Sequence, residues 1–319
     1  MTPEIRLHFR EPTVDTNRPI ADGAVPIEGF ELHLVGRPED ADAWDCSFAM
    51  RMLGFAEEPR CVSIPAFPNR KFRLSYIYVN ERAGIGAPLD LEGKRVGIRA
   101  WANTAGVWAR GALQHHYGVD LSRIYWVAAR ADATKLPAKM KIEFLRDRAR
   151  DSFGAPQDLD SLLVAGEIDA VIDADVPPSI TRRDGRTRRL FRDYKSEEQD
   201  YFRKTGIFPI SHVVTLHESF VARHPDAPVA LLKAFRRARD IAINNIQGSD
   251  PQILILTWAS QALDEQRALM GDDYFAYDIA HNRTALGAMM QFAHEQFLTS
   301  ELIDYRRLFW PAAMELPGV

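Results

Sequence analysis

The chain alternates short strand-like stretches with longer helical ones. Alternating apolar and polar residues predict strands at 4–9 (EIRLHF) and 30–35 (FELHLV), and a largely apolar run predicts another at 75–79. Apolar residues at helical spacing predict long helices over 228–246 and 282–297. Strands with helices between and after them indicate an α/β fold.

The clearest single unit lies at residues 89–129. RVGI (95–98) predicts a strand, and the apolar stripe that starts near Thr104 predicts a helix that ends at Gly118. IYWVAA (124–129) then predicts a second strand. A strand–helix–strand sequence of this kind predicts a parallel pair with a right-handed crossover.

The length of the chain, 319 residues, exceeds what one hydrophobic core usually organises, so we expect two lobes. Further strands are predicted around 168–173 and 212–216. We expect lobe 1 to be discontinuous, with residues 1–97 and 213–319, and lobe 2 to comprise residues 98–212. In such folds ligands bind beyond strand ends, in a cleft between the lobes.

Composition and charge exclude several functions. The chain is 46% hydrophobic and 26% charged with a formal net charge of -4, which gives no reason to expect a nucleic-acid partner. The basic stretch Arg182–Arg192 is better explained as a solvated surface than as an anion site. No apolar run approaches the ~20 residues of a membrane span, and the N-terminus lacks the apolar core of a secretory signal.

The cysteine content points the same way. Cys46 and Cys61 are the only cysteines and show no metal-ligand spacing, so we expect no metal site; a disulfide between them stays open. These features together predict a reduced, cytoplasmic protein that does not associate with membranes. Self-association into a homo-oligomer also stays open.

Several motifs carry a family resemblance. The stretches FPNRKFR (67–73), DLEGKRVGI (90–98), GEIDAVI (166–172), TGIFPISH (205–212) and NRTALGAMMQFAHEQFLT (282–299) occur in one order along nearly the whole chain. In these stretches the chain resembles the bacterial 4,5-dihydroxyphthalate decarboxylase family, which is related to the type II periplasmic solute-binding proteins. The resemblance implies a two-lobe fold of that type, with a ligand cleft between the lobes.

The resemblance also implies an activity. It implies cofactor-independent decarboxylation of a hydroxylated aromatic carboxylic acid, 4,5-dihydroxyphthalate to protocatechuate or a close analogue. The alternative is a non-catalytic solute-binding protein for an aromatic carboxylate, against which the missing leader argues. The family's early Tyr-Asp-Arg-Thr run is replaced here by VDTNR, which keeps Asp15 and moves the arginine to Arg18, a candidate substrate contact.

Two pairs of residues are candidates for binding the substrate carboxylates. Arg70 and Arg73 each present a planar fork that matches a carboxylate, although structural ion pairs would explain them as well. Asn103 and Thr104 begin the helix after RVGI, where free N–H groups favour an anion. A plain helix cap explains that pair equally well.

The remaining candidates concern proton transfer. His212 is the first choice as proton donor to the ring, since the pKa of histidine lies near the working range. Asp45 or Asp15 would handle the phenol, Ser47 could donate to a carboxylate or phenol, and Asp173 could contact the substrate from the end of its strand. Without the resemblance, a lone histidine on an apolar strand is more simply a buried structural residue.

Overall fold

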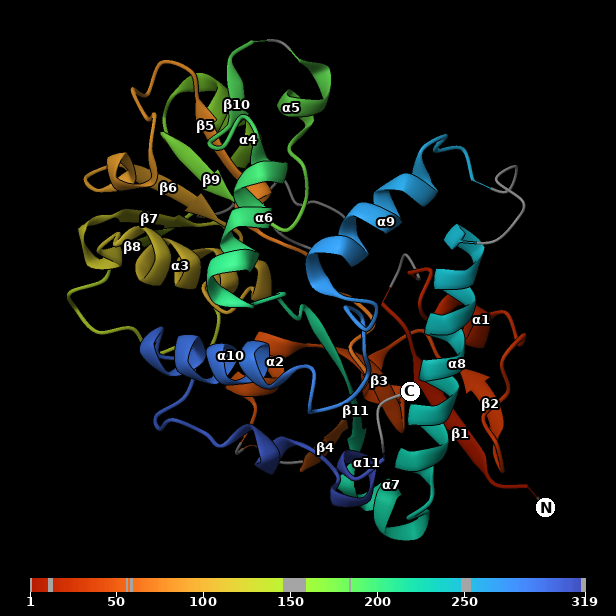
Figure 1. The fold of residues 1–319 in the computed structure, drawn as a ribbon. Helices are drawn as coiled ribbons and strands as arrows, with labels where there is room; N and C mark the ends of the chain where they lie inside the picture. The colour runs from red at the N-terminus through yellow and green to blue at the C-terminus, as the bar shows by residue number, and fades with distance from the viewer. Residues whose placement is uncertain are drawn as a thin grey trace. The chain divides into compact units, whose positions relative to one another are not determined.

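The chain forms two compact units in the computed structural model, drawn in Figure 1. Unit 1 comprises Met1–Arg70, Ile210–Gly287 and Ile303–Val319, and unit 2 comprises Lys71–Pro209 and Ala288–Leu302. The residues that the structure describes are 2–10, 14–55, 57, 60–145, 159–183, 185–247 and 254–316.

Unit 1 is built on a five-stranded sheet with the order β2-β1-β3-β11-β4. Its strands are β1 (Glu4–His8), β2 (Glu31–Leu34), β3 (Ala43–Ser47), β4 (Cys61–Ile64) and β11 (His212–His217). β1 runs parallel to β2 and β3, whereas β11 is antiparallel to both β3 and β4. β11 therefore places a late segment of the chain between two early strands.

Six helices in the described part of unit 1 accompany this sheet. They are α1 (Arg18–Ala21), α2 (Phe48–Leu53), α7 (Glu218–Arg223), α8 (Ala227–Gln247), α9 (Ala259–Met270), which packs on α8, and α11 (Pro311–Met314). The long helix α8, which runs beside the sheet in Figure 1, packs against β4 and buries Leu231 and Phe235 completely. The ring of Phe235 meets that of Phe9 edge-on, with 6.0 Å between centroids.

Unit 2 is built on a six-stranded sheet with the order β10-β5-β9-β6-β7-β8. Its strands are β5 (Ile77–Asn80), β6 (Arg95–Ile98), β7 (Tyr125–Ala128), β8 (Lys141–Phe144), β9 (Ala170–Ile172) and β10 (Thr187–Arg189). β9, β6, β7 and β8 are parallel, and β5 is antiparallel to β9 and β10. The predicted parallel pair is confirmed: β6 and β7 pair through α3 (Thr104–Tyr117).

The described part of the chain contains four further helices and several 3-10 turns. They are α4 (Leu159–Ala165), α5 (Pro178–Arg182), α6 (Tyr194–Thr205) and α10 (Arg283–Glu295), with 3-10 turns at Pro38–Asp40, Leu74–Tyr76, Pro88–Leu91, Leu121–Arg123 and Tyr305–Leu308. None of the helices within the described ranges is both long and apolar enough to cross a membrane.

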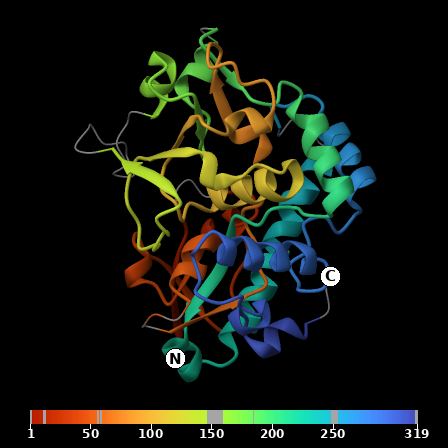
Figure 2. The same ribbon diagram turned by 90° about the vertical axis from the view of Figure 1, so that its left-hand side faces the viewer.

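The second half of α10 packs against α3, as Figure 2 shows. Gly111 makes this contact possible, since a Cβ there would lie 2.1 Å from the ring of Phe292. Beyond the helix end, Gln296 accepts a hydrogen bond from Nε of the fully buried Arg110 at 2.8 Å and donates to the Val107 carbonyl at 2.9 Å. The Trp101 indole donates to the Gln296 carbonyl at 2.7 Å. The C-terminal segment thereby completes the core of unit 2.

The division between the units differs from the one expected from the sequence. We expected the first crossing near residue 97, but it falls between Arg70 and Lys71. The reason is strand pairing: β5 bonds to β9 and β10 and so belongs to the second sheet. The second crossing lies at Pro209–Ile210, close to the expected position, and residues 288–302 return to unit 2.

Candidate functional site

A histidine–aspartate pair lies inside unit 1. Asp45 on β3 is opposite Val214 of β11, so its side chain shares a sheet face with His212, two residues earlier in β11. His212 Nδ1 lies 2.8 Å from Asp45 Oδ1, and each residue is only 7% exposed. When the carboxylate of Asp45 is ionised it can only accept, so Nδ1 is then the donor and Nε2 is the ring nitrogen that can exchange a proton.

Tyr277 lies close to this pair in the same unit. It is fully buried, its ring stands edge-on to that of Phe67 at 6.4 Å, and burial raises the pKa of its hydroxyl. Arg239, Asp45 and Arg70 all act electrostatically on this hydroxyl. The charges of Asp45 and Arg70 thus act on the same buried hydroxyl.

Arg70 is held where the chain leaves the first sheet. Its backbone forms an isolated antiparallel β-bridge with Ile210. Its Nη1 donates to the Tyr274 carbonyl at 3.4 Å, and its guanidinium lies 5.8 Å from the centre of the Phe275 ring. Burial lowers the pKa of Arg70 to about 9, which Tyr277 and Asp278 partly offset. An anion bound here would favour the charged form further.

Two more guanidiniums surround Tyr277. Arg236 donates from Nε and Nη2 to the Tyr277 carbonyl, at 3.0 and 2.8 Å, and Arg239 lies 5.3 Å from the centre of the Tyr277 ring. Both arginines are buried, being 8% and 5% exposed. Arg239 is also ion-paired with Asp240, with Nη2 2.5 Å from Oδ1, so its charge is partly neutralised.

The VDTNR segment places different residues inside than we expected. Asp15 is exposed and its carboxylate accepts the backbone N–H of Thr16 at 2.9 Å, while Arg18 is exposed at the start of α1. The residues between them, Thr16 and Asn17, are buried instead, and Thr16 donates to the Pro68 carbonyl at 2.6 Å. The catalytic role of Asp15 toward the phenol and the role of Arg18 in substrate binding both stay predictions.

Asp45 and Ser47 also differ in setting. Asp45, which we expected to handle the phenol, is engaged with His212, an arrangement that orients the imidazole. Ser47 is the residue before α2 and pairs with His212 across the sheet. Both are thus neighbours of His212 in space, although residues 71–209 of unit 2 lie between them and His212 in the sequence.

Arg73 belongs to unit 2 and is set in an aromatic environment. It is 8% exposed, and its guanidinium lies 5.1 Å from the centre of the Tyr76 ring. Burial lowers the pKa of Arg73, and Tyr76 and Glu198 act in the opposite direction. Glu198 accepts the backbone N–H of Ser75 at 2.8 Å. The structure therefore ties Arg73 to unit 2 and Arg70 to unit 1.

The other candidates in unit 2 have clear local roles. Asn103 caps α3, accepting the backbone N–H of Gly106 at 3.2 Å, and Thr104 is buried in the first turn. Asp173 follows β9 and forms an ion pair with Arg99 at 3.1 Å. Burial raises the pKa of Asp173 despite that arginine.

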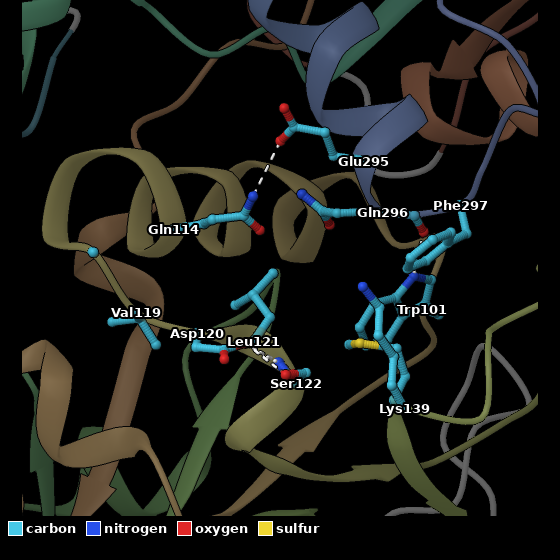
Figure 3. A pocket seen from close by; sticks show the side chains of 12 residues that line it. Trp101, Gln114, Val119, Asp120, Leu121, Ser122, Lys139, Glu295, Gln296 and Phe297 are labelled. Atoms are coloured by element: carbon cyan, nitrogen blue, oxygen red, sulfur yellow. Dashed lines mark hydrogen bonds between the residues drawn. The ribbon is translucent and has the colours of Figure 1, made fainter.

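A separate pocket of about 610 Å³ lies in unit 2 (Figure 3). At one wall Gln114 of α3 donates to Glu295 of α10 at 3.2 Å, and Trp101, Lys139 and Phe297 line the other side. None of the candidate residues from the sequence lines this pocket. Within the described ranges, no cluster of three or more His, Cys, Asp or Glu side chains is arranged to hold a metal ion.

Sequence reasoning missed Tyr277 and the two arginines of α8. Tyr277 lies in the aromatic stretch YFAYD (274–278), whose density of rings outside a predicted helix was the available signal. Arg236 and Arg239 are three residues apart and share one face of α8, but their burial follows from tertiary packing alone.

Comparison with known proteins supports the resemblance. The chain is 29% identical to 4,5-dihydroxyphthalate decarboxylase of Comamonas testosteroni over an alignment of 327 positions, which covers 98% of each chain. It is also 29% identical over 198 residues to the enzyme of that name from Pseudomonas putida, covering 58% of this chain and 77% of that one. The chain is a homologue of the 4,5-dihydroxyphthalate decarboxylases. No family model matches it.

Solved structures identify the fold. The periplasmic aliphatic sulphonate binding protein SsuA of Escherichia coli superposes with a TM-score of 0.59 at 14% identity, covering 98% of this chain and 99% of that one. The desulfurization enzyme DSZB superposes with a TM-score of 0.57 at 16% identity, covering 97% of each. The predicted α/β fold of the type II periplasmic-binding-protein kind is therefore confirmed. A binding protein and an enzyme share this fold. The function of this decarboxylase homologue therefore has to be argued from its side chains.

Proposed function

We propose that this decarboxylase homologue is a carboxy-lyase that removes CO2 from a hydroxylated aromatic carboxylic acid, 4,5-dihydroxyphthalate or a close analogue. The observation that carries the proposal is the buried pair in which His212 Nδ1 lies 2.8 Å from Asp45 Oδ1. Homology over 98% of the chain to a decarboxylase of this name supports the substrate class.

In the proposed reaction, His212 protonates the ring carbon that bears the departing carboxylate. A hydroxyl para to that carbon stabilises the resulting cation, the carbon–carbon bond breaks, and loss of CO2 restores the aromatic ring. Asp45 is a positioning residue: its carboxylate holds the proton on Nδ1 and stabilises the imidazolium before transfer. The imidazole can then transfer the proton from Nε2 without rotating.

Arg70 would hold the carboxylate that remains on the product. Its fork suits bidentate contact, and Tyr277 lies beside it with a hydroxyl that stays protonated, because burial raises its pKa. Arg236 adds positive charge beside Tyr277, which favours binding of a dianion, whereas the charge of Arg239 is paired with Asp240. The departing carboxylate needs the opposite, a contact-poor setting, since salt bridges would stabilise the charge that must disperse.

The test is a product assay. Purified protein incubated with 4,5-dihydroxyphthalate should release CO2 and form protocatechuate, and His212→Ala should lower kcat by about 10³-fold. Ligand binding, read by calorimetry, should persist in that variant. His33→Gln is the matched control, since His33 is a half-exposed histidine of the same unit and should leave kcat unchanged.

Other outcomes would contradict the proposal. Binding of 4,5-dihydroxyphthalate without any CO2 release would identify a solute-binding protein. CO2 release that survives His212→Ala would place the proton donor elsewhere. If a panel of hydroxylated benzoates and phthalates shows no binding and no turnover, the proposed substrate class is wrong.

A further inference from the structure

The face of the first sheet opposite His212 carries a cysteine–histidine pair. Cys61 begins β4 and His217 ends β11, and the two are direct partners in the antiparallel register. Cys61 Sγ lies 3.7 Å from His217 Nδ1. His217 is five residues beyond His212, and since neighbouring side chains of a strand alternate, the two imidazoles point to opposite faces.

The imidazole of His217 is fixed by its surroundings. Its ring lies 4.8 Å from the ring of Trp44, and its backbone N–H donates to the Asp42 carbonyl at 3.1 Å. Burial and the charge of Arg6 lower the pKa of His217, while Asp42 raises it. A lowered pKa keeps the imidazole neutral, and therefore able to accept a proton, to a lower pH than an ordinary histidine.

Arg51 supplies positive charge next to the thiol. Its Nη2 donates to the Cys61 carbonyl at 2.7 Å and its Nε to Ser63 Oγ at 3.3 Å. Cys61 and Cys46 both interact favourably with this guanidinium when ionised. The charged side chains that face the pair are Arg51 from α2, Arg6 from β1, Asp42 before β3 and Glu218 from α7, which acts through Arg51.

Cys46 provides an internal contrast. It is partly buried like Cys61, but its Sγ contacts the Ser47 carbonyl at 3.5 Å, and burial raises the pKa of its thiol to about 11. The two cysteines of this chain therefore differ in the neighbour of the sulfur: a carbonyl for Cys46 and an imidazole nitrogen for Cys61. A nucleophile within reach of a base is the arrangement that activates a thiol.

We propose that Cys61 is a covalent modification site whose thiol adds to activated alkenes, with His217 as the base. In the addition, the sulfur forms a bond to the β-carbon of the alkene as the carbon–carbon π bond breaks. The thiol proton passes to His217 Nδ1 and is finally bound by the carbon next to the carbonyl. No oxidant, reductant or leaving group is needed, and His212 takes no part.

Acrylamide is the probe, because it is small and reacts slowly enough for rates to be compared. Peptide mapping by mass spectrometry at pH 7 should show Cys61 labelled at least about 10-fold faster than Cys46. His217→Gln should slow labelling of Cys61 about 10-fold and leave that of Cys46 unchanged. The control is His224→Gln, which replaces a different histidine of the same unit and should alter neither rate.

The pH profile of the unchanged chain gives a second readout that needs no variant. Between pH 7.5 and 6.5 an ordinary thiol loses about tenfold in rate, because its thiolate fraction falls tenfold. Cys61 should lose less than about threefold, since neutral His217 accepts the proton during attack. If His217→Gln unfolds the unit, labelling of Cys46 will rise. In that case the pH profile of the unchanged chain decides whether a base assists Cys61.

Two results would overturn the proposal. One is labelling of Cys61 no faster than labelling of Cys46 in the folded chain. The other is a tenfold loss of the Cys61 rate between pH 7.5 and 6.5, which would show that no base assists the thiol.

Discussion

Two candidate residues of unit 1, His212 and Asp45, contact each other, whereas the candidates of unit 2 have structural partners within their own unit. In unit 1, Asp45 and His212 meet at 2.8 Å although 167 positions separate them in the chain. In unit 2, Asn103 reaches only the N–H of Gly106, three positions away. Both sets of residues are polar and partly or fully buried, so burial alone does not distinguish them.

The difference concerns what each contact explains. A cap satisfies a donor that every helix leaves open at its start, so the fold alone requires a residue such as Asn103. The fold makes no such demand for a carboxylate and an imidazole on one face of an inner pair of strands. Burying them costs free energy that a pair of apolar side chains would not. This contrast is the reason why we propose His212 and Asp45 of unit 1 as the residues that act in the reaction.

The largest expected effect is that of Asp45→Asn. The amide would no longer hold the proton on His212 Nδ1, and we expect kcat for CO2 release to fall about 10²–10⁴-fold with little change in KM. Asp40→Asn is the control, because Asp40 is an exposed carboxylate of the same unit that pairs with Arg37. A loss of binding in place of turnover would show that Asp45 contacts the substrate directly.

The next effect compares the two arginines of the FPNRKFR motif. Arg70→Lys replaces a fork by a point charge, so we expect KM to rise about 10-fold, equivalent to ~1.4 kcal/mol. Arg73→Lys should change KM less than about threefold if the contrast between the units holds. Steady-state kinetics on both variants, with circular dichroism as a check of folding, measures this. An equal rise for Arg73→Lys would break the contrast.

Asn103→Ala tests the cap reading. Loss of the cap should lower the free energy of unfolding by about 1 kcal/mol, measured by urea titration, with KM unchanged. Asn103→Ser keeps a capping oxygen and should restore most of that stability. A KM that rises in both variants would mean that the amide contacts the substrate, which would extend the site into unit 2.

The smallest effect concerns Asp173. Because burial raises its pKa in the folded chain, Asp173 favours the folded state below its unfolded pKa, and that contribution is lost as the pH rises through the folded value. As the pH rises from about 4 to about 7, the free energy of unfolding of the unchanged chain should therefore fall relative to that of Asp173→Asn. Asp175→Asn is the control, since Asp175 pairs with the same Arg99 but is 64% exposed. A difference that does not vary with pH would contradict the raised pKa.

The sequence predicted the elements well where one local pattern sufficed. The helix expected from Thr104 to Gly118 is α3, which ends at Tyr117 and is followed by Gly118 as its C-cap with a φ of +73°, a conformation that glycine adopts without strain. The strands expected at 4–9, 30–35 and 124–129 correspond to β1, β2 and β7. The position of the first crossing could not be read, because only pairing with β9 and β10 assigns β5 to unit 2.

The site was predictable in part. His212 and Asp45 were both candidates, but their mutual contact depends on the register between β3 and β11, which no local pattern encodes. Tyr277 was not a candidate, since its importance comes from what lies around it. In VDTNR the sequence pointed to the charged residues, while the structure buries the neutral Thr16 and Asn17.

The return of residues 288–302 to unit 2 has a consequence for biosynthesis. When the ribosome has made residues 71–209, the guanidinium of Arg110 still lacks the Gln296 side chain, and the Trp101 indole lacks its carbonyl acceptor. Those partners emerge only when nearly the whole polypeptide has been translated. Residues 71–209, the larger part of this unit, must therefore wait for its last segment until the end of synthesis, so a nascent chain stalled before residue 288 would be a natural client for chaperones.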